Sequence, residues 1–389
     1  MALTDFVIKN YRSVKDVWLK MQRITVVVGP NGSGKSNLYR AMYLVASTAN
    51  GQLARSIAEE GGMESVVWCG AYSKNDRHQL SLSVKVNDLQ YDLGCGIASQ
   101  LDGTLFCKDL EIKRERVFIM KSGLKSRILD RGRAEITARD SAGRTTDYTK
   151  RVAGNESILT GLREPHRYPE LSSLRQEFLD WRFYHDFRTD RDSPLRKPHL
   201  PVATPVMSHD GSDFVSALGT ILEMGDADGL QKCLNDAFPG AELQIVPSVA
   251  GLRLYLKSPE FERPFDASEL SDGTLQYLCL LAAFFSLTPP SVLAINEPET
   301  SIHPSLFDAL AKLIVKASEQ SQIWITTHSR DLADYILEYS GYAPLELEKV
   351  DGETRLMGVK LGIHKDPDDE DDDEDQNADE VDNAAEVDE

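Results

Sequence analysis

The sequence predicts an α/β fold in which a mixed sheet carries helices on both faces, joined by an antiparallel β-meander and a helical insertion. Two observations predict the core. Short apolar runs alternate with helical patterns near both ends of the chain, as in 24–28 before 35–46 and 292–295 before 304–317. These runs are uninterrupted rather than alternating, which is typical of parallel strands buried on both faces.

The composition is that of a globular protein, with 389 residues and 41% hydrophobic content. No segment approaches the roughly 18 consecutive apolar residues that a membrane span needs. The N-terminal residues MALTDFVIKNYRS lack the apolar core of a signal peptide. The five cysteines show no paired CxxC spacing, so we expect reduced, mostly buried thiols. We therefore expect a cytoplasmic protein with no membrane partner.

The formal charge of −19 is concentrated at the C-terminus, where 366–389 contains fifteen acidic residues and no Lys or Arg. Such a segment buries little apolar area, so we expect a disordered tail. A solubilising tail is the simplest interpretation; a DNA mimic or a docking arm are the alternatives.

The order of elements follows from the patterns along the chain. Segments from 79 to 120 alternate in polarity and predict an antiparallel meander. Helical spacing dominates 170–238, apart from a Pro-rich stretch at 194–205. After residue 264, helix 275–285, strand 292–295, helix 304–317 and strand 323–326 restore the α/β pattern, and a turn at 351–352 closes a hairpin.

A glycine-rich segment, GPNGSGKS at 29–36, lies between the first buried strand and a helix. This context predicts a P-loop, in which backbone N–H groups and the helix N-terminus hold phosphates. Lys35 is expected to reach the β- and γ-phosphates, and Ser36 to bind Mg²⁺. The expected nucleotide-binding residues of this segment are Asn31, Gly32, Ser33, Gly34, Lys35, Ser36 and Asn37.

Polar residues follow the two later buried strands. SVLAINEPET places Asn296 and Glu297 at the end of one strand, where ligands of parallel sheets bind. Glu297 is the candidate for orienting or deprotonating the attacking water. ITTHS ends the next strand with His328, which we expect to hydrogen-bond the γ-phosphate. Upstream, LSDGT at 270–274 precedes an apolar helix; alone it would be an ordinary helix cap.

Together, GPNGSGKS, LSDGT, NEPETSIHP and TTHS resemble the ABC-type ATPase heads of the SMC, RecF and OLD-like group, among AAA-family ATPases. Residues 6–42 and the segment WRFYHDFRTD are also similar to such proteins. The resemblance implies a P-loop NTPase of ABC type that binds ATP with Mg²⁺. We expect a compact form, since the 389 residues leave no space for a long coiled coil or a toprim domain.

The resemblance also implies a homodimer that forms when ATP binds. LSDGT would be the signature loop, in which Ser271 and the N–H of Gly273 contact the γ-phosphate held by a second subunit. Residues 301–304 would take the D-loop position, and Arg12 would be a basic nucleotide contact. Asn296 replaces the usual Asp beside Mg²⁺, so we expect slow hydrolysis. The usual Q-loop glutamine has only a weak candidate, Gln79.

The predicted division is an N-terminal lobe at 1–71, an insertion at 72–265, a C-terminal lobe at 266–365 and the tail at 366–389. Within the insertion, 108–133 contains nine basic and four acidic residues, which favours either a DNA-backbone patch or a solvated sheet face. The run 182–197 is a second basic segment.

We expect an ATP-driven dimerisation switch in DNA maintenance or antiviral defence, with double-stranded DNA or a separately encoded effector such as a nuclease as partners. An ATP-gated protein-binding scaffold is the alternative.

Overall fold

A computed structural model of the chain describes residues 2–71, 79–98, 109–121, 124–132, 135–149 and 152–358. Residues Met1–Leu356 form one compact unit, and a second unit covers Met357–Glu389. The predicted acidic tail and Cys107 lie outside the described residues. In the part of the chain described here, no helix has both the length and the apolar character needed to cross a membrane.

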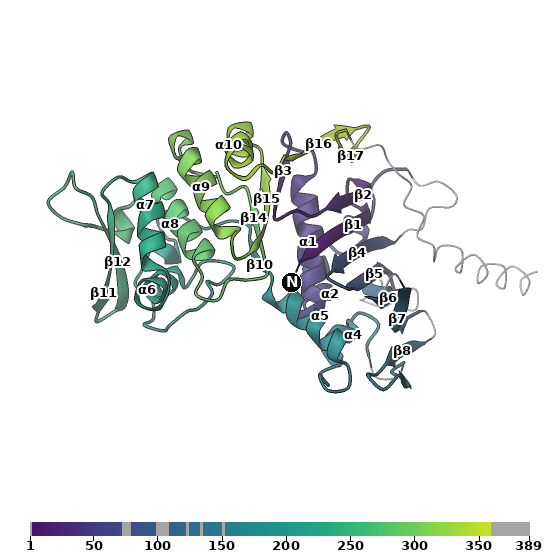
Figure 1. Ribbon diagram of the computed structural model, residues 1–389. Coiled ribbons are helices and arrows are strands. Elements are labelled where there is room, and N and C mark those ends of the chain that lie inside the picture. The colour runs from purple at the N-terminus through teal and green to yellow at the C-terminus, as the bar shows by residue number, and fades with distance from the viewer. Residues whose placement is uncertain are drawn as a thin grey trace, which may run out of the picture. The chain divides into compact units, whose positions relative to one another are not determined.

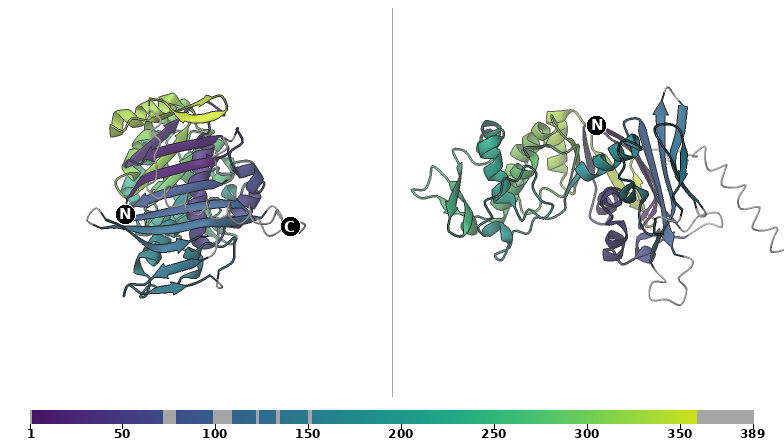
Figure 2. Two further views of the ribbon diagram at one scale, coloured as in Figure 1. Left: turned by 90° about the vertical axis from the view of Figure 1, so that its right-hand side faces the viewer. Right: turned by 90° about the horizontal axis from the view of Figure 1, so that it is seen from below.

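An eight-stranded antiparallel sheet contains the predicted meander and is larger than expected. The N-terminal strands join it, because Phe6 on the first strand pairs with both Leu19 and Val84. Figure 2 (left) shows these strands crossing one face with helix behind them. Their order is β2 (Val14–Lys20), β1 (Leu3–Tyr11), β4 (Leu80–Val86), β5 (Leu89–Ile97), β6 (Leu110–Lys121), β7 (Leu124–Arg131), β8 (Ile136–Arg139) and β9 (Thr145–Asp147).

The six-stranded sheet carries the predicted buried strands. All of its neighbouring pairs are parallel except the last, which is the predicted closing hairpin around Asp351 and Gly352. The order is β10 (Arg182–Tyr184), β14 (Val292–Asn296), β15 (Gln322–Thr327), β3 (Ile24–Val28), β16 (Leu345–Val350) and β17 (Glu353–Leu356).

Alternate residues of the parallel strands enter two different cores. Val292 and Ala294 belong to the core that contains α1 (Lys35–Asn50) and the antiparallel sheet. Leu293 and Ile295 belong to the core of α8 (Asp272–Phe284), α9 (Phe307–Ala317) and α10 (Arg330–Ser340). Figure 1 shows α1 between the two sheets, and α8 to α10 on the opposite face of the parallel sheet. This explains the uninterrupted apolar strands, since both faces are covered.

The middle of the chain differs from the prediction in its strands. It contains the expected helices, but β10 joins the parallel sheet and a three-stranded sheet follows the helices. The predicted division at residues 71 and 265 stays a prediction. The remaining elements are α2 (Leu53–Glu59), α3 (Met63–Val66), α4 (Ile158–Gly161), α5 (Pro169–Asp180), η1 (Pro194–Arg196), α6 (Phe214–Met224), α7 (Ala227–Ala237), β11 (Glu242–Ser248), β12 (Gly251–Lys257), β13 (Phe265–Asp266), η2 (Ala267–Glu269) and η3 (Pro304–Leu306).

Candidate functional site

The predicted site residues gather at the carboxyl edge of the parallel sheet. In register, Asn296 of β14 lies opposite Thr326 of β15, and Thr327 lies opposite Val28 of β3. The P-loop, the Glu297 loop and the His328 loop therefore leave three adjacent strands at the same edge. Parallel sheets bind ligands at this edge.

The P-loop has the backbone shape that a phosphate cradle requires. Gly32 and Gly34 have φ angles of 80° and 105°, in the left-handed region that glycine tolerates. Gly34 is also the N-cap of α1, so no side chain covers the free N–H groups at the start of this 16-residue helix. Asn31 is exposed and Ser33 is buried. The first turn of α1 can therefore receive an anion.

A chain of hydrogen bonds ties the P-loop to β17. Asn37 Nδ2 donates to Ser13 Oγ at 2.8 Å, and Ser13 Oγ lies 2.8 Å from Thr354 Oγ1. Thr354 Oγ1 in turn donates to Ser33 O at 2.8 Å. A Cβ on Gly34 would lie 2.1 Å from Thr354 Oγ1. Asn37 thus supports the loop, and the β17 contact restricts Gly34 to glycine.

Lys35 is buried at the centre of the site, with 4% of its side chain exposed. Its Nζ donates to Gly29 O at 2.8 Å and to Pro30 O at 3.1 Å, and it lies 4.0 Å from Glu297 Oε1. Burial lowers the pKa of Lys35, while Glu297 and Glu299 act in the opposite direction. Ser36 follows it in the first turn of α1.

Glu297 has a strained backbone at the end of β14. Its φ is 49°, an uncommon value for a residue other than glycine, and its N–H donates to Thr326 O at 2.8 Å. Its side chain is 30% exposed, so a carboxylate is presented to ligand and solvent. Next to it, Asn296 Oδ1 accepts a hydrogen bond from Thr326 Oγ1 at 2.7 Å.

His328 contacts a second carboxylate that the sequence reasoning missed. Its Nδ1 lies 3.0 Å from Glu299 Oε1 and 3.8 Å from Glu297 Oε2. Glu299 is only 4% exposed, and it also accepts hydrogen bonds from the Thr327 hydroxyl and the His328 N–H. The EPE spacing after a buried strand is the only signal in the sequence that could have pointed to it.

The LSDGT loop is at the surface of the chain. Ser271 is exposed and caps α8, where its Oγ accepts from Thr274 N at 3.2 Å. A Cβ on Gly273 would lie 2.5 Å from Ser301 O, so the loop touches the predicted D-loop. Arg196 supports the loop through hydrogen bonds. Its guanidinium donates to Leu270 O and to Asp272 Oδ1, both at 2.7 Å.

Two weaker candidates contact other residues in the described structure. Arg12, with φ 50°, pairs through Nη2 with Glu60 Oε2 at 2.8 Å. The Gln79 side chain lies beside Gly94 of β5, in the antiparallel sheet. On the side of β14 away from β15, β10 pairs Tyr184 with Ile295, which places His185 next to the Asn296 end of β14.

His185 is a second residue near the site that the sequence patterns did not indicate. Its ring centroid lies 5.6 Å from that of Tyr39 on α1. Partial burial lowers the pKa of His185 and Arg40 lowers it further, while Asp186 and Glu297 act in the opposite direction. The imidazole lies beside the helix that starts at the P-loop.

Many of the basic residues in the two basic segments have acidic partners. Arg116 pairs with Asp130 at 2.9 Å, and Arg131 lies 3.6 Å from the fully buried Glu115. In the second segment, Arg188 pairs with Asp190 at 2.5 Å. Within 108–133 these ion pairs offset part of the positive charge that a DNA-backbone patch would use, and the pair of Arg131 with Glu115 is buried.

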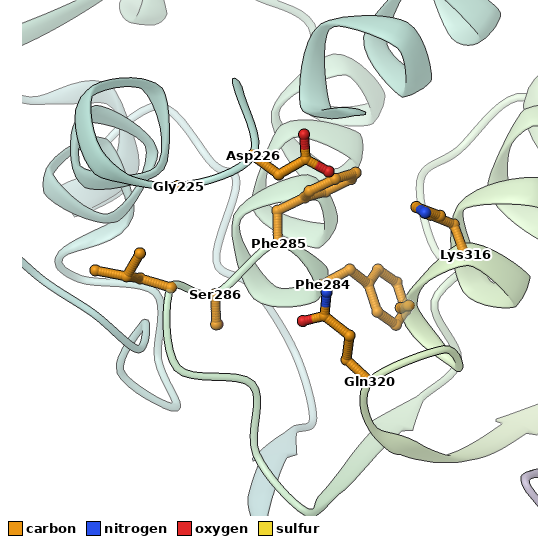
Figure 3. Close-up of a pocket in the computed structure, with 9 residues that line it drawn as sticks. Gly225, Asp226, Phe284, Phe285, Ser286, Lys316 and Gln320 are labelled. Carbon is orange, nitrogen blue, oxygen red and sulfur yellow. The ribbon is translucent and has the colours of Figure 1, made fainter. Parts of the chain in front are cut away.

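A separate pocket of about 150 Å³ lies at the opposite end of α8 and α9 (Figure 3). Phe284 and Phe285 at the end of α8, and Lys316 at the end of α9, contribute to its lining, together with Asp226 before α7. The predicted site residues do not line this pocket. It is therefore not part of the candidate site.

The residues present fit ATP with Mg²⁺. The P-loop and Lys35 would hold the phosphates, and the donor set of a serine hydroxyl (Ser36) and an amide oxygen (Asn296) suits a magnesium ion and its water ligands. The fold and this site define the protein as a P-loop NTPase.

Comparisons with known proteins agree with this class. Residues 24–334 match the family described as "AAA domain, putative AbiEii toxin, Type IV TA system", and the chain belongs to that family. No curated protein matches the chain.

Two solved structures share the fold. One is an SMC head bound to the C-winged helix domain of ScpA, with 14% identity, a TM-score of 0.51 and coverage of 93% of this chain and 99% of that chain. The other is an SMC head with an extended coiled coil, bound to a C-terminal domain of ScpA from Pyrococcus furiosus. It has 12% identity, a TM-score of 0.51 and coverage of 97% and 99%.

Proposed function

We propose that the chain binds ATP with Mg²⁺ and hydrolyses it slowly, as a switch that dimerises when the nucleotide is bound. The observation that supports this most strongly is the convergence of Lys35, Glu297 and His328 at one sheet edge. Lys35 would neutralise charge on the phosphates, and Glu297 would orient and deprotonate the attacking water. Bound Mg²⁺ would neutralise further charge on the phosphates.

The exposed signature loop supports the dimerisation part of the proposal. Ser271 and Asp272 face solvent, and Arg196 and Ser301 keep the loop in place. A second protomer could therefore present its nucleotide to Ser271 and the Gly273 N–H, and two such contacts would close an isologous dimer. Dimerisation would then be coupled to nucleotide binding.

Glu297→Gln tests the catalytic assignment. The amide keeps the shape of the side chain but cannot accept the proton, so ATP should bind with parental affinity while turnover falls by about a hundredfold or more. Phosphate release and binding of a fluorescent ATP analogue measure the two properties separately. Hydrolysis at the parental rate would remove Glu297 from the mechanism.

The pathway we propose is DNA maintenance or antiviral defence, with a separately encoded effector. The alternative, an ATP-gated scaffold that binds protein and not DNA, is favoured by the ion pairs of Arg116 and Arg131, and by neighbours whose structures contain domains of ScpA. Salt-dependent binding of duplex DNA, measured with the full chain and with a variant ending at residue 365, separates the two. Absence of binding with and without ATP would leave the scaffold.

A further inference from the structure

Glu299 is a buried carboxylate that the proposed catalytic step does not use. Its side chain is 2% exposed, and it lies just after β14 in the same loop as Glu297. A buried carboxylate is costly unless several donors surround it. Its presence in the site therefore calls for an explanation.

One oxygen of Glu299 receives all of its hydrogen bonds within the described residues. Oε1 accepts from Thr327 Oγ1 at 2.5 Å and from His328 N at 2.9 Å, and it lies 3.0 Å from His328 Nδ1. Oε2 is buried, with no hydrogen-bond partner in the described part of the chain. Two of these three contacts are with a single residue, His328, through its backbone N–H and its ring.

The contact between Glu299 and His328 determines which ring nitrogen is left for a ligand. The 3.0 Å approach of Nδ1 to Glu299 Oε1 is a close charge contact, and an ionised carboxylate, which accepts but does not donate hydrogen bonds, favours the proton on this nitrogen. The 3.8 Å separation from Glu297 is too long for a competing hydrogen bond. With Nδ1 held by Glu299, Nε2 of the half-exposed ring is the atom left for a ligand.

We propose that Glu299 is a positioning residue that fixes the ring of His328, with Nδ1 protonated and Nε2 directed to the terminal phosphate. The two carboxylates after β14 then have different tasks: Glu297 acts on water, and Glu299 orients the histidine. This inference rests on the proposed ATPase function. Buried carboxylate partners of functional histidines commonly act in this way, by fixing the tautomer and the ring orientation.

Kinetics provide the first test. Glu299→Met removes the acceptor and should lower kcat by about ten- to a hundredfold with KM for ATP unchanged. Glu299→Gln keeps an acceptor oxygen and should restore part of that loss. Glu319→Gln, which breaks a surface ion pair with Lys316 at 2.6 Å, is the matched control and should leave kcat unchanged. A rise in KM with kcat unchanged would contradict a positioning role.

A double-mutant cycle asks whether Glu299 acts through His328. If it does, Glu299→Met should have no further effect on kcat once His328→Ala is present. Additive losses in the double variant would overturn the proposal. Should Glu299→Met fail to fold, the cycle is run with Glu299→Gln, and the same comparison applies.

The tautomer provides a readout that does not depend on ATP turnover. In the ¹⁵N spectrum of the full chain with labelled histidine, the resonances lost in His328→Gln should show a proton on Nδ1. In Glu299→Met the proton should move toward Nε2. An Nε2-protonated His328 in the parental protein would overturn the proposal. A protonated Nδ1 in a protein without measurable turnover would instead count against the ATPase function alone.

Discussion

Single residues at the sheet edge combine burial with charge. Lys35 is almost fully buried, yet two backbone carbonyls and the Glu297 carboxylate lie around its amine. These oxygens offset part of the desolvation that lowers its pKa. A triphosphate would supply a stronger set of acceptors. The amine therefore already lies at the position where it would bind the phosphates.

Lys35→Ala should weaken ATP binding strongly. It removes charge-assisted hydrogen bonds worth about 1.5–3 kcal/mol each, which corresponds to a loss of affinity of more than about tenfold. Isothermal titration calorimetry measures this loss directly. Lys312→Ala, which removes a surface lysine paired with Asp308 on α9, is the control and should bind normally. Parental affinity in Lys35→Ala would show that the P-loop does not hold the nucleotide.

The sequence indicated the residues whose position follows from local pattern, and it did not indicate those placed by tertiary contact. Glu297 and His328 follow buried strands, so their place at the sheet edge could be predicted. Glu299 lies only two residues further, but its role depends on the adjacent strand β15, which is near it only because β14 and β15 pair. Single-sequence patterns contain no such information.

Elements as well as residues hold the P-loop in shape. The hairpin of β16 and β17 packs beside β3, and Thr354 of β17 bonds to the loop. The hairpin itself was predicted from the Asp351-Gly352 turn, but its contact with Ser33 was not. The short strand β10 was missed because its three residues follow a helical pattern and are recognised as a strand only by pairing with β14.

Gly34→Ala should destabilise the P-loop, whereas Gly32→Ala should have a smaller effect. Both glycines have positive φ angles, but a Cβ on Gly34 would overlap Thr354 and a Cβ on Gly32 would meet no atom within 4 Å in the described structure. We expect Gly34→Ala to cost about 1–3 kcal/mol of unfolding free energy. Urea denaturation of the two variants measures this, and equal losses would show that the β17 contact is unimportant.

At the scale of the whole molecule, two histidines make stability depend on pH: His199 is buried, and the ring of His209 is partly shielded from water although the residue is exposed. Burial lowers the pKa of His199 and of His209 below the ordinary value of 6.5. Nδ1 of His209 contacts the backbone of Phe183 on β10, with 2.9 Å to the carbonyl oxygen. Below pH 6.5 the unfolded chain binds more protons than the folded chain, so stability falls as the pH falls toward the folded-state pKa values.

His209→Asn should weaken this pH dependence. The asparagine side chain can replace Nδ1 in the contact with Phe183 but does not titrate. Urea denaturation between about pH 7 and about pH 5 should therefore give a smaller loss of unfolding free energy in the variant than in the parental protein. The same loss in both proteins would show that His209 does not contribute.

The central claim also belongs to this scale, because the proposed site is completed by a second copy of the chain. The SMC-head fold, the P-loop and the exposed LSDGT loop are the features on which it rests. Ser271 should meet the partner's nucleotide, and a bulky charged residue there should block closure without unfolding the protomer.

Sedimentation velocity of Glu297→Gln with Mg²⁺ and ATP tests this claim most directly. The account predicts that ATP doubles the mass of the particle, and that Ser271→Arg added to the same chain keeps it monomeric although each protomer still binds ATP. An unchanged mass in the presence of ATP, or a dimer that forms equally well with Ser271→Arg, would contradict it.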